Sequence, residues 1–207
     1  MIAAVLVVAS TNRGKVAELE SLLGDLPLRL VPIDAALRDP PRVVEDGRTF
    51  AENAAKKARA AAAATGMLAL ADDSGLEVDA LDGRPGVRSA RFAREGAGDD
   101  ENNAALIAEL ARSGRAGPFP ARFRCVLAVA DGRPGQRSPL LLTDGTCEGA
   151  IIDAPRGLHG FGYDPLFVVA GTGRTMAELT PAEKNRVSHR ARAASALRPP
   201  LAALLTC

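Results

Sequence analysis

Two adjacent aspartates, Asp72 and Asp73, follow an apolar run over 67–71 in the segment Ala-Asp-Asp-Ser-Gly-Leu. The run predicts a buried strand, so we expect the pair in a turn at the end of that strand, where α/β proteins carry their chemistry. Neighbouring carboxylates repel each other unless a cation or hydrogen-bond donors share the site, which favours a Mg²⁺ site. A solvated turn is the alternative, because Asp, Ser and Gly are ordinary turn residues.

A polar loop between a predicted strand over 3–9 and a predicted helix over 15–23 could bind phosphate. It consists of Ser10, Thr11, Asn12, Arg13, Gly14 and Lys15. Backbone N–H groups and the helix dipole at a helix start favour an anion. The loop is not a Walker A loop, because Ala9 replaces the first glycine of that motif and Val16 its Ser/Thr. A polar N-cap without a ligand is the alternative.

An aromatic loop precedes the apolar strand predicted over 166–170. It contains Phe161, Gly162, Tyr163 and Asp164, and Tyr163 is the only tyrosine of the chain. The aromatic rings could stack on a flat base, with Asp164 accepting a hydrogen bond from a ring N–H. They could equally form a lid over the edge of the core.

Three basic side chains follow near the C-terminal end. A proline after a threonine cap predicts a helix that begins at Pro181. On a continuous helix Lys184, His189 and Arg190 would point in widely separated directions, so convergence on one ligand requires a break over 185–188. The alternative is a solvated basic helix face.

The composition limits the function classes. The chain has 207 residues, 47% of them hydrophobic, and a net charge of +1, which gives no electrostatic footprint for a nucleic-acid partner. The run over 3–9 lacks the flanks of a signal peptide, and no stretch approaches the roughly 20 apolar residues that span a membrane. We therefore expect no membrane partner and a cytoplasmic location. The three cysteines have no short metal-ligand spacing, which predicts reduced thiols.

The remaining patterns predict a mixed α/β protein. Because strands alternate with helices early in the chain and cluster in its middle, we expect two lobes on one shared sheet in a single domain over 1–207. The predicted elements are a strand over 28–32, a loop over 39–47, a helix over 50–65 with a capping box at Thr49 and a terminal Gly66, a strand over 76–81, a helix over 100–113, a strand over 121–131, and antiparallel strands over 140–143 and 148–152 joined by a turn at Asp144-Gly145.

Six motifs in order, from residue 7 to about residue 194, resemble the inosine triphosphate pyrophosphatase family, the RdgB-like enzymes that hydrolyse non-standard purine nucleoside triphosphates. They are S-T-N-R-G-K, E-D-G-R-T-F-A-E-N-A, A-D-D-S-G-L, P-G-V-R-S-A-R-F, G-F-G-Y-D-P and A-E-L-T-P-A-E-K-N-R-V-S-H-R. The resemblance implies an elongated mixed β-sheet flanked by helices, two lobes with a nucleotide cleft between them, and a homodimer. It also implies conversion of a small-molecule purine triphosphate (ITP, dITP or XTP) and water to the monophosphate and pyrophosphate.

The resemblance further assigns roles to residues. The loop of residues 10–15 would hold the triphosphate, assisted by Ser74. Glu45 and Asp73 would organise Mg²⁺, and Asp73 would act as general base. The base and phosphate pocket would be formed by Phe161, Gly162, Tyr163, Asp164, Lys184, His189 and Arg190. Val44 stands where some relatives have a second acid, which leaves Asp72 as a candidate second metal carboxylate.

Recognition of the base would rest on the purine 6-position. His189 and Arg190 can donate to the carbonyl of hypoxanthine or xanthine, whereas the amino group of adenine would leave them unpaired. Two alternatives remain. One is a Maf-like pyrophosphatase for modified pyrimidine triphosphates, which needs the same phosphate chemistry. The other is a nucleotide-binding regulator without turnover, against which the acidic pair argues, because a carboxylate beside the phosphates weakens binding unless metal is present.

Overall fold

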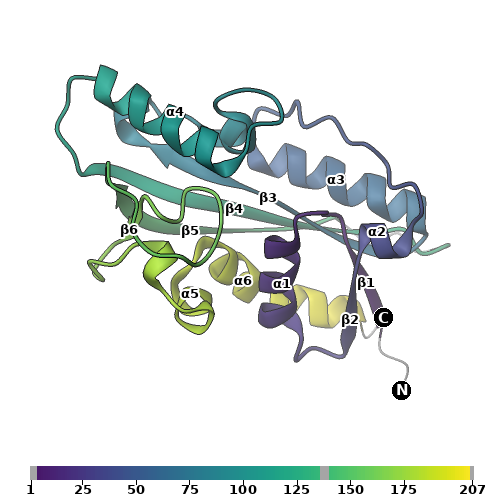
Figure 1. Cartoon of the computed structure of the whole chain (residues 1–207). Coiled ribbons are helices and arrows are strands. Elements are labelled where there is room, and N and C mark those ends of the chain that lie inside the picture. The colour runs from purple at the N-terminus through teal and green to yellow at the C-terminus, as the bar shows by residue number, and fades with distance from the viewer. Residues whose placement is uncertain (1–3, 136–139, 206–207) are drawn as a thin grey trace. The chain divides into compact units, whose positions relative to one another are not determined.

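The computed structural model describes residues 4–135 and 140–205, which form one six-stranded sheet with flanking helices (Figure 1). The strand order is β2-β1-β3-β4-β5-β6. β1 pairs in parallel with β2 and β3, whereas β5 and β6 are antiparallel, so the sheet is mixed as predicted. The strands are β1 Ala4–Val8, β2 Leu28–Pro32, β3 Leu68–Val78, β4 Phe119–Asp131, β5 Leu141–Ile151 and β6 Phe167–Val169. The helices are α1 Arg13–Leu23, α2 Ile33–Ala36, α3 Phe50–Thr65, α4 Asp99–Arg112, α5 Pro181–Val187 and α6 His189–Leu205.

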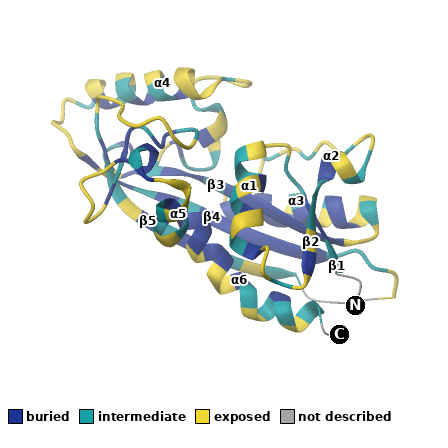
Figure 2. Cartoon of the chain, turned by 60° about the horizontal axis from the view of Figure 1, so that its bottom comes forward, coloured by how far each residue is buried: buried dark blue, intermediate teal, exposed yellow. Residues whose placement is uncertain are grey.

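The chain divides into two compact units, each built from separate segments. Unit 1 comprises Met1–Asp73, Cys125–Gly145 and Arg190–Cys207, and unit 2 comprises Ser74–Arg124 and Thr146–His189. The long strands β3, β4 and β5 each contribute residues to both units. Each unit has its own apolar core, and Figure 2 shows the buried residues of the chain in dark blue.

In unit 1, helices α1 and α6 supply one layer of the core. Val16 and Leu19 of α1 and Leu197 of α6 pack with Leu70 of β3 and Leu127 of β4. All five side chains are at most 5% exposed, so burial of apolar surface holds the two helices against the sheet.

Local signals explain the helix ends. Thr49 caps α3 by accepting a hydrogen bond from the Glu52 backbone N–H at 3.2 Å, and α3 ends at Gly66, whose φ of +66° is left-handed. The Asn12 side chain caps α1 by accepting from the Lys15 backbone N–H at 3.1 Å. Both helices begin and end within two residues of the predicted bounds.

Two predicted turns are wrong. The acidic pair Asp72 and Asp73 does not end a strand but lies in the middle of β3, which runs without interruption to Val78. Likewise Asp144-Gly145 is no turn, because β5 is one strand of 11 residues. In β3 the two carboxylates are paired with cations, and charge pairing removes the penalty that local preference places on Asp inside a strand.

Four short elements were not predicted, because they lie in segments too short for a periodic pattern. They are the helix α2 and the 3₁₀ turns η1 Asp79–Leu81, η2 Gly86–Arg91 and η3 Met176–Glu178. The strand predicted over 76–81 is therefore wrong at its end, because its first three residues belong to β3 and its last three form η1. Within the described ranges, no helix combines the length and hydropathy that crossing a bilayer requires.

Candidate functional site

Asp72 and Asp73 are neighbours in β3, and successive side chains of a strand point to opposite faces of the sheet. Their partners agree with this geometry. Asp72 contacts Lys15 of α1 and Arg190 of α6, whereas Asp73 contacts Lys57 of α3. The prediction that the two carboxylates share one cation is therefore wrong, because strand alternation separates them and each has its own cation.

Asp72 is the centre of a buried ionic cluster. Its Oδ1 lies 2.5 Å from Lys15 Nζ, and its Oδ2 accepts hydrogen bonds from Arg190 Nε at 2.8 Å and from the Cys125 thiol at 3.2 Å. Burial raises the pKa of this carboxyl, but Arg190 and Lys15 outweigh it and hold the pKa well below its usual range. Asp72 is thus ionised at neutral pH and holds Lys15 in place, and its candidacy as a second metal carboxylate stays a prediction.

Arg190 is enclosed in the same cluster. Its side chain is 1% exposed and pairs with Asp72 and with Glu18 of α1. Burial lowers the pKa of the guanidinium, but Asp72 and Glu18 more than compensate, so Arg190 remains charged. The cluster ties the C-terminal segment of unit 1 to α1 and β3, a role that sequence reasoning did not assign to Arg190.

The predicted helix break is confirmed. Helix α5 ends at Val187, Ser188 is extended with ψ of 156°, and α6 begins at His189. In unit 2 the His189 ring stacks on Phe123, with ring centroids 4.8 Å apart and an interplanar angle of 19°. His189 is buried, so the solvated basic face is excluded for it.

The opposite face of β3 carries Asp73. Lys57 Nζ donates to Asp73 Oδ1 at 2.7 Å and to Glu45 Oε2 at 2.9 Å, and Asn53 Nδ2 donates to Asp73 Oδ2 at 3.3 Å. Burial raises the pKa of Asp73 to about 6, against the opposing effect of Lys57. Such a carboxylate is ionised at neutral pH, and its pKa lies near the value that suits a general base.

Sequence reasoning missed Asn53 and Lys57. They are four residues apart on α3, so both project from the same face of the helix. The Asn53 side chain also accepts from the Gly47 backbone N–H at 2.8 Å, which fixes the loop that carries Glu45. A polar i, i+4 pair on an otherwise alanine-lined helix face was the signal that could have identified them.

Glu45 and Asp73 suit a Mg²⁺ ion in donor type and charge. Magnesium prefers oxygen ligands and commonly takes one or two carboxylates together with substrate phosphates. Burial raises the pKa of Asp73, and a cation bound to its carboxylate would offset that effect. Among the described residues, no group of three or more His, Cys, Asp or Glu side chains is placed to hold a metal ion.

The loop of residues 10–15 forms the expected connection between β1 and α1. Besides the Asn12 cap, Ser10 Oγ accepts from the Asn12 backbone N–H at 3.1 Å. Arg13 is exposed and pairs with Asp34 at 3.0 Å. Thr11 is also exposed. The loop therefore contains the polar N-cap of α1, and phosphate binding by it stays a prediction. Of this loop only the Lys15 ammonium is held against a buried carboxylate.

The aromatic loop lies in unit 2 and has two parts. Tyr163 belongs to the core, and its hydroxyl donates to the Ser89 carbonyl at 2.9 Å, which confirms the core-edge alternative for this residue. Asp164 is buried, and its Oδ2 accepts from Lys184 Nζ at 2.6 Å. The same ammonium lies 4.8 Å from the centroid of the Phe161 ring.

The predicted site residues thus form two sets, one in each unit. Unit 1 contains the phosphate loop, Glu45 and the two aspartates, and Lys15 is close enough to lower the pKa of both Glu45 and Asp73. Unit 2 contains Ser74, which follows in β3 and is half-buried, together with the aromatic loop and Lys184. The predicted cleft between the lobes stays a prediction.

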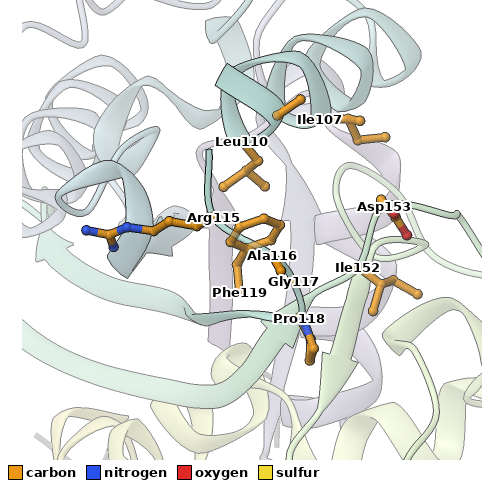
Figure 3. A pocket seen from close by; sticks show the side chains of 10 residues that line it. Ile107, Leu110, Arg115, Ala116, Gly117, Pro118, Phe119, Ile152 and Asp153 are labelled. Carbon is orange, nitrogen blue, oxygen red and sulfur yellow. The ribbon is translucent and has the colours of Figure 1, made fainter. Parts of the chain in front are cut away.

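A separate cavity of about 610 Å³ lies in unit 2 (Figure 3). Its walls are mainly apolar and include Leu110, Phe119 and Ile152, and the Arg115 side chain points away from the other labelled side chains. This volume is within the range of small-ligand sites, roughly 300–1,000 Å³. However, none of the residues that line it is a predicted site residue, and its walls lack the donors that a triphosphate needs.

Known proteins match this chain over almost its whole length. The model of the Ham1 family matches residues 6–199. A dITP/XTP pyrophosphatase of Geobacter sulfurreducens is 50% identical over 196 residues, covering 93% of this chain and 94% of that protein. One of Methylococcus capsulatus is 48% identical over 201 residues, covering 96% of each.

A solved structure is also similar. The HAM1 protein of Coxiella burnetii superposes with a TM-score of 0.83 at 41% identity, covering 98% of each chain. The predicted family and fold therefore agree with sequence and structural relatives alike, and the chain belongs to the Ham1 family.

Proposed function

We propose that this protein is a nucleoside triphosphate pyrophosphatase that removes non-standard purine nucleotides, namely ITP, dITP and XTP, from the nucleotide pool. The observation that carries the proposal is the arrangement of Lys57 between Asp73 and Glu45, in a chain about half of whose residues are identical to those of proteins named dITP/XTP pyrophosphatases. A base carboxylate beside fixed cations is the arrangement that attack on a polyanionic phosphate requires.

In this mechanism Asp73 accepts a proton from a water molecule as that water attacks the α-phosphorus. The bond between the α-phosphorus and the bridging oxygen then breaks, and pyrophosphate leaves. The Lys15 ammonium, held in place by Asp72, neutralises charge on the triphosphate. The oriented N–H groups at the start of α1 add donors to the same anion.

Mg²⁺ is the cofactor we propose for this site, with Glu45 and Asp73 as its protein ligands. When bound, it would supply charge neutralisation at the phosphate oxygens. Lys57 would then share the two carboxylates with the ion and keep them oriented. Lys184, His189 and the aromatic loop are assigned to the base and the remaining phosphates. Arg190, which the resemblance places in the same pocket, is paired with Asp72 and Glu18 and supports the position of Lys15 through Asp72.

The direct test is release of pyrophosphate from a panel of triphosphates with and without Mg²⁺. We expect rapid release from ITP, dITP and XTP, slow release from ATP and GTP, and no activity in the presence of a chelator. Preference for modified pyrimidine triphosphates would favour the Maf-like alternative. Tight binding without turnover would favour a regulator, and release of orthophosphate would contradict the position of bond cleavage.

The family resemblance also leads us to propose a homodimer that acts in the cytoplasm. Sedimentation equilibrium of the full chain at several concentrations measures the mass of the species in solution. A monomer at all concentrations would contradict the dimer.

A further inference from the structure

Both backbone groups of Gly162 are held by the first turn of α4. The Gly162 N–H donates to Asp99 Oδ2 at 2.7 Å, and the Gly162 carbonyl accepts from Asn103 Nδ2 at 3.0 Å. Asp99 and Asn103 are four residues apart and so lie on the same helix face. The N–H belongs to the Phe161–Gly162 peptide and the carbonyl to the Gly162–Tyr163 peptide, so the two contacts together restrict both backbone dihedrals of Gly162.

The flanking residues of the loop have other anchors. The Phe161 N–H donates to Asp164 Oδ2 at 3.0 Å, which in turn is held by Lys184. Tyr163 is fixed through Ser89. Gly162 lies between these anchors in the left-handed region, with φ of +63°, a conformation in which glycine moves readily. Without the contacts from α4, the carbonyl and N–H of Gly162 would be free to turn, and Phe161 would turn with them.

We propose that Asp99 and Asn103 are positioning residues that hold the aromatic loop in the conformation that binds the purine base. The inference rests on the proposed function, because it takes the Phe161 side chain to be part of the base site. Both residues act through Gly162, so they influence affinity for the base and leave the phosphate chemistry at Asp73 unchanged.

The expected kinetic signature is a change in KM without a change in kcat. If only a fraction of the molecules carries the loop in the binding conformation, the apparent dissociation constant rises by the inverse of that fraction. A drop from nearly full order to about one tenth in Asp99→Ala would raise KM for ITP about tenfold. Once substrate is bound, the loop is ordered again, so kcat stays within about twofold.

Asp99→Asn and Asp100→Ala are the matched controls. The asparagine retains an acceptor for the Gly162 N–H, so it should restore a KM close to that of the wild type. Asp100 is exposed in the same helical turn, and its substitution removes the same charge from the same helix end. Asp100→Ala should leave KM unchanged, which separates loop positioning from a general effect on α4.

Amide hydrogen exchange tests the loop without any substrate. In Asp99→Ala we expect faster exchange at Phe161, whose N–H binds Asp164 and not Asp99, and no such change in Asp100→Ala. The near-ultraviolet circular dichroism of Tyr163, the only tyrosine in a chain without tryptophan, should persist and show that the fold is intact. Asn103→Ala combined with Asp99→Ala should raise KM by less than the product of the single effects, because both act through Gly162.

The outcomes are separable. Faster exchange with an unchanged KM for ITP would show that the two residues hold the loop but that the loop does not bind the base, which overturns the inference while pyrophosphate release remains intact. Unchanged exchange at Phe161, or a loss confined to kcat, would show that Asp99 and Asn103 do not position the loop. Absence of pyrophosphatase activity in the wild type would instead contradict the proposed function, and the exchange result would still report on the loop.

Discussion

Lysine is rare in this protein, and its few positions are informative. The chain has only four lysines among 26 basic residues, and Lys15, Lys57 and Lys184 are each paired with a buried carboxylate of the candidate site. The fourth, Lys56, pairs with exposed Asp46. Where arginine is the general surface cation, a lysine at a site indicates a need for a compact point charge on a flexible stem.

Asp73→Asn tests the catalytic assignment at the level of one residue. The substitution keeps the shape of the side chain and removes its charge, so we expect kcat for ITP to fall roughly 10²-fold or more, as general base and metal ligand are lost together. Steady-state pyrophosphate release gives the rate, and circular dichroism checks the fold. Asp79→Asn, an exposed carboxylate just beyond the end of β3, should be as active as the wild type; near wild-type turnover in folded Asp73→Asn would exclude the role.

At the scale of elements, short helices depend on their caps. Helix α5 has only seven residues, too few to be stable alone. Thr180 and Glu183 form a reciprocal capping box at its start, in which Glu183 Oε2 accepts from the Thr180 backbone N–H at 2.8 Å. This box fixes the direction in which α5 carries Lys184 towards Asp164.

Glu183→Gln tests this cap through the pH dependence of stability. The hydrogen bond from Arg174, with those from the Thr180 backbone and hydroxyl, lowers the pKa of Glu183 from 4.5 to about 2. Because the folded pKa is depressed, the contribution of Glu183 is fully present above pH 4.5 and is lost as pH falls towards 2. The free energies of unfolding of wild type and variant, measured by urea denaturation across this window, should converge at the acid end. A constant difference between them would show that the ionisation of Glu183 does not contribute.

Strand continuity was the part of the fold that local patterns could not reveal. The segments Asp-Asp-Ser-Gly in β3 and Asp-Gly in β5 have the composition of turns, yet both are extended. The helices were predictable because caps and apolar periodicity are local signals. By contrast, the partners that stabilise Asp72 are as many as 118 residues away along the chain, and no local window contains them. For the same reason the pairing of Arg190 became visible only in three dimensions.

At the scale of the whole molecule, the Asp72 cluster joins distant segments of the chain. It connects α1, β3 and α6 through Lys15, Asp72 and Arg190. Buried charges are expensive unless they are paired, so the cluster is sensitive to the loss of any one member. Lys15 therefore keeps its position only while Asp72 and Arg190 remain paired.

A double-mutant cycle on Arg190 and Asp72 measures this dependence. Arg190→Ala leaves Asp72 with less compensation and should lower the free energy of unfolding by about 3–5 kcal/mol. Adding Asp72→Asn removes the excess charge and should recover part of the loss, with a coupling energy within roughly 0.5–3 kcal/mol. Urea denaturation gives all four values. Strictly additive losses would show that the two side chains do not stabilise each other.

The interleaved segments of unit 1 have a consequence for synthesis on the ribosome. Strands β1 and β3 pack against Ala193, Leu197 and Leu201 of α6, which is translated long after both strands. Unit 1 therefore has no complete core until α6 has been synthesised, and the nascent chain must be kept from aggregating until then. A premature stop codon shortly before Arg190 would remove α6 and leave the apolar residues of β1 and β3 exposed to solvent. We expect the truncated product to be degraded.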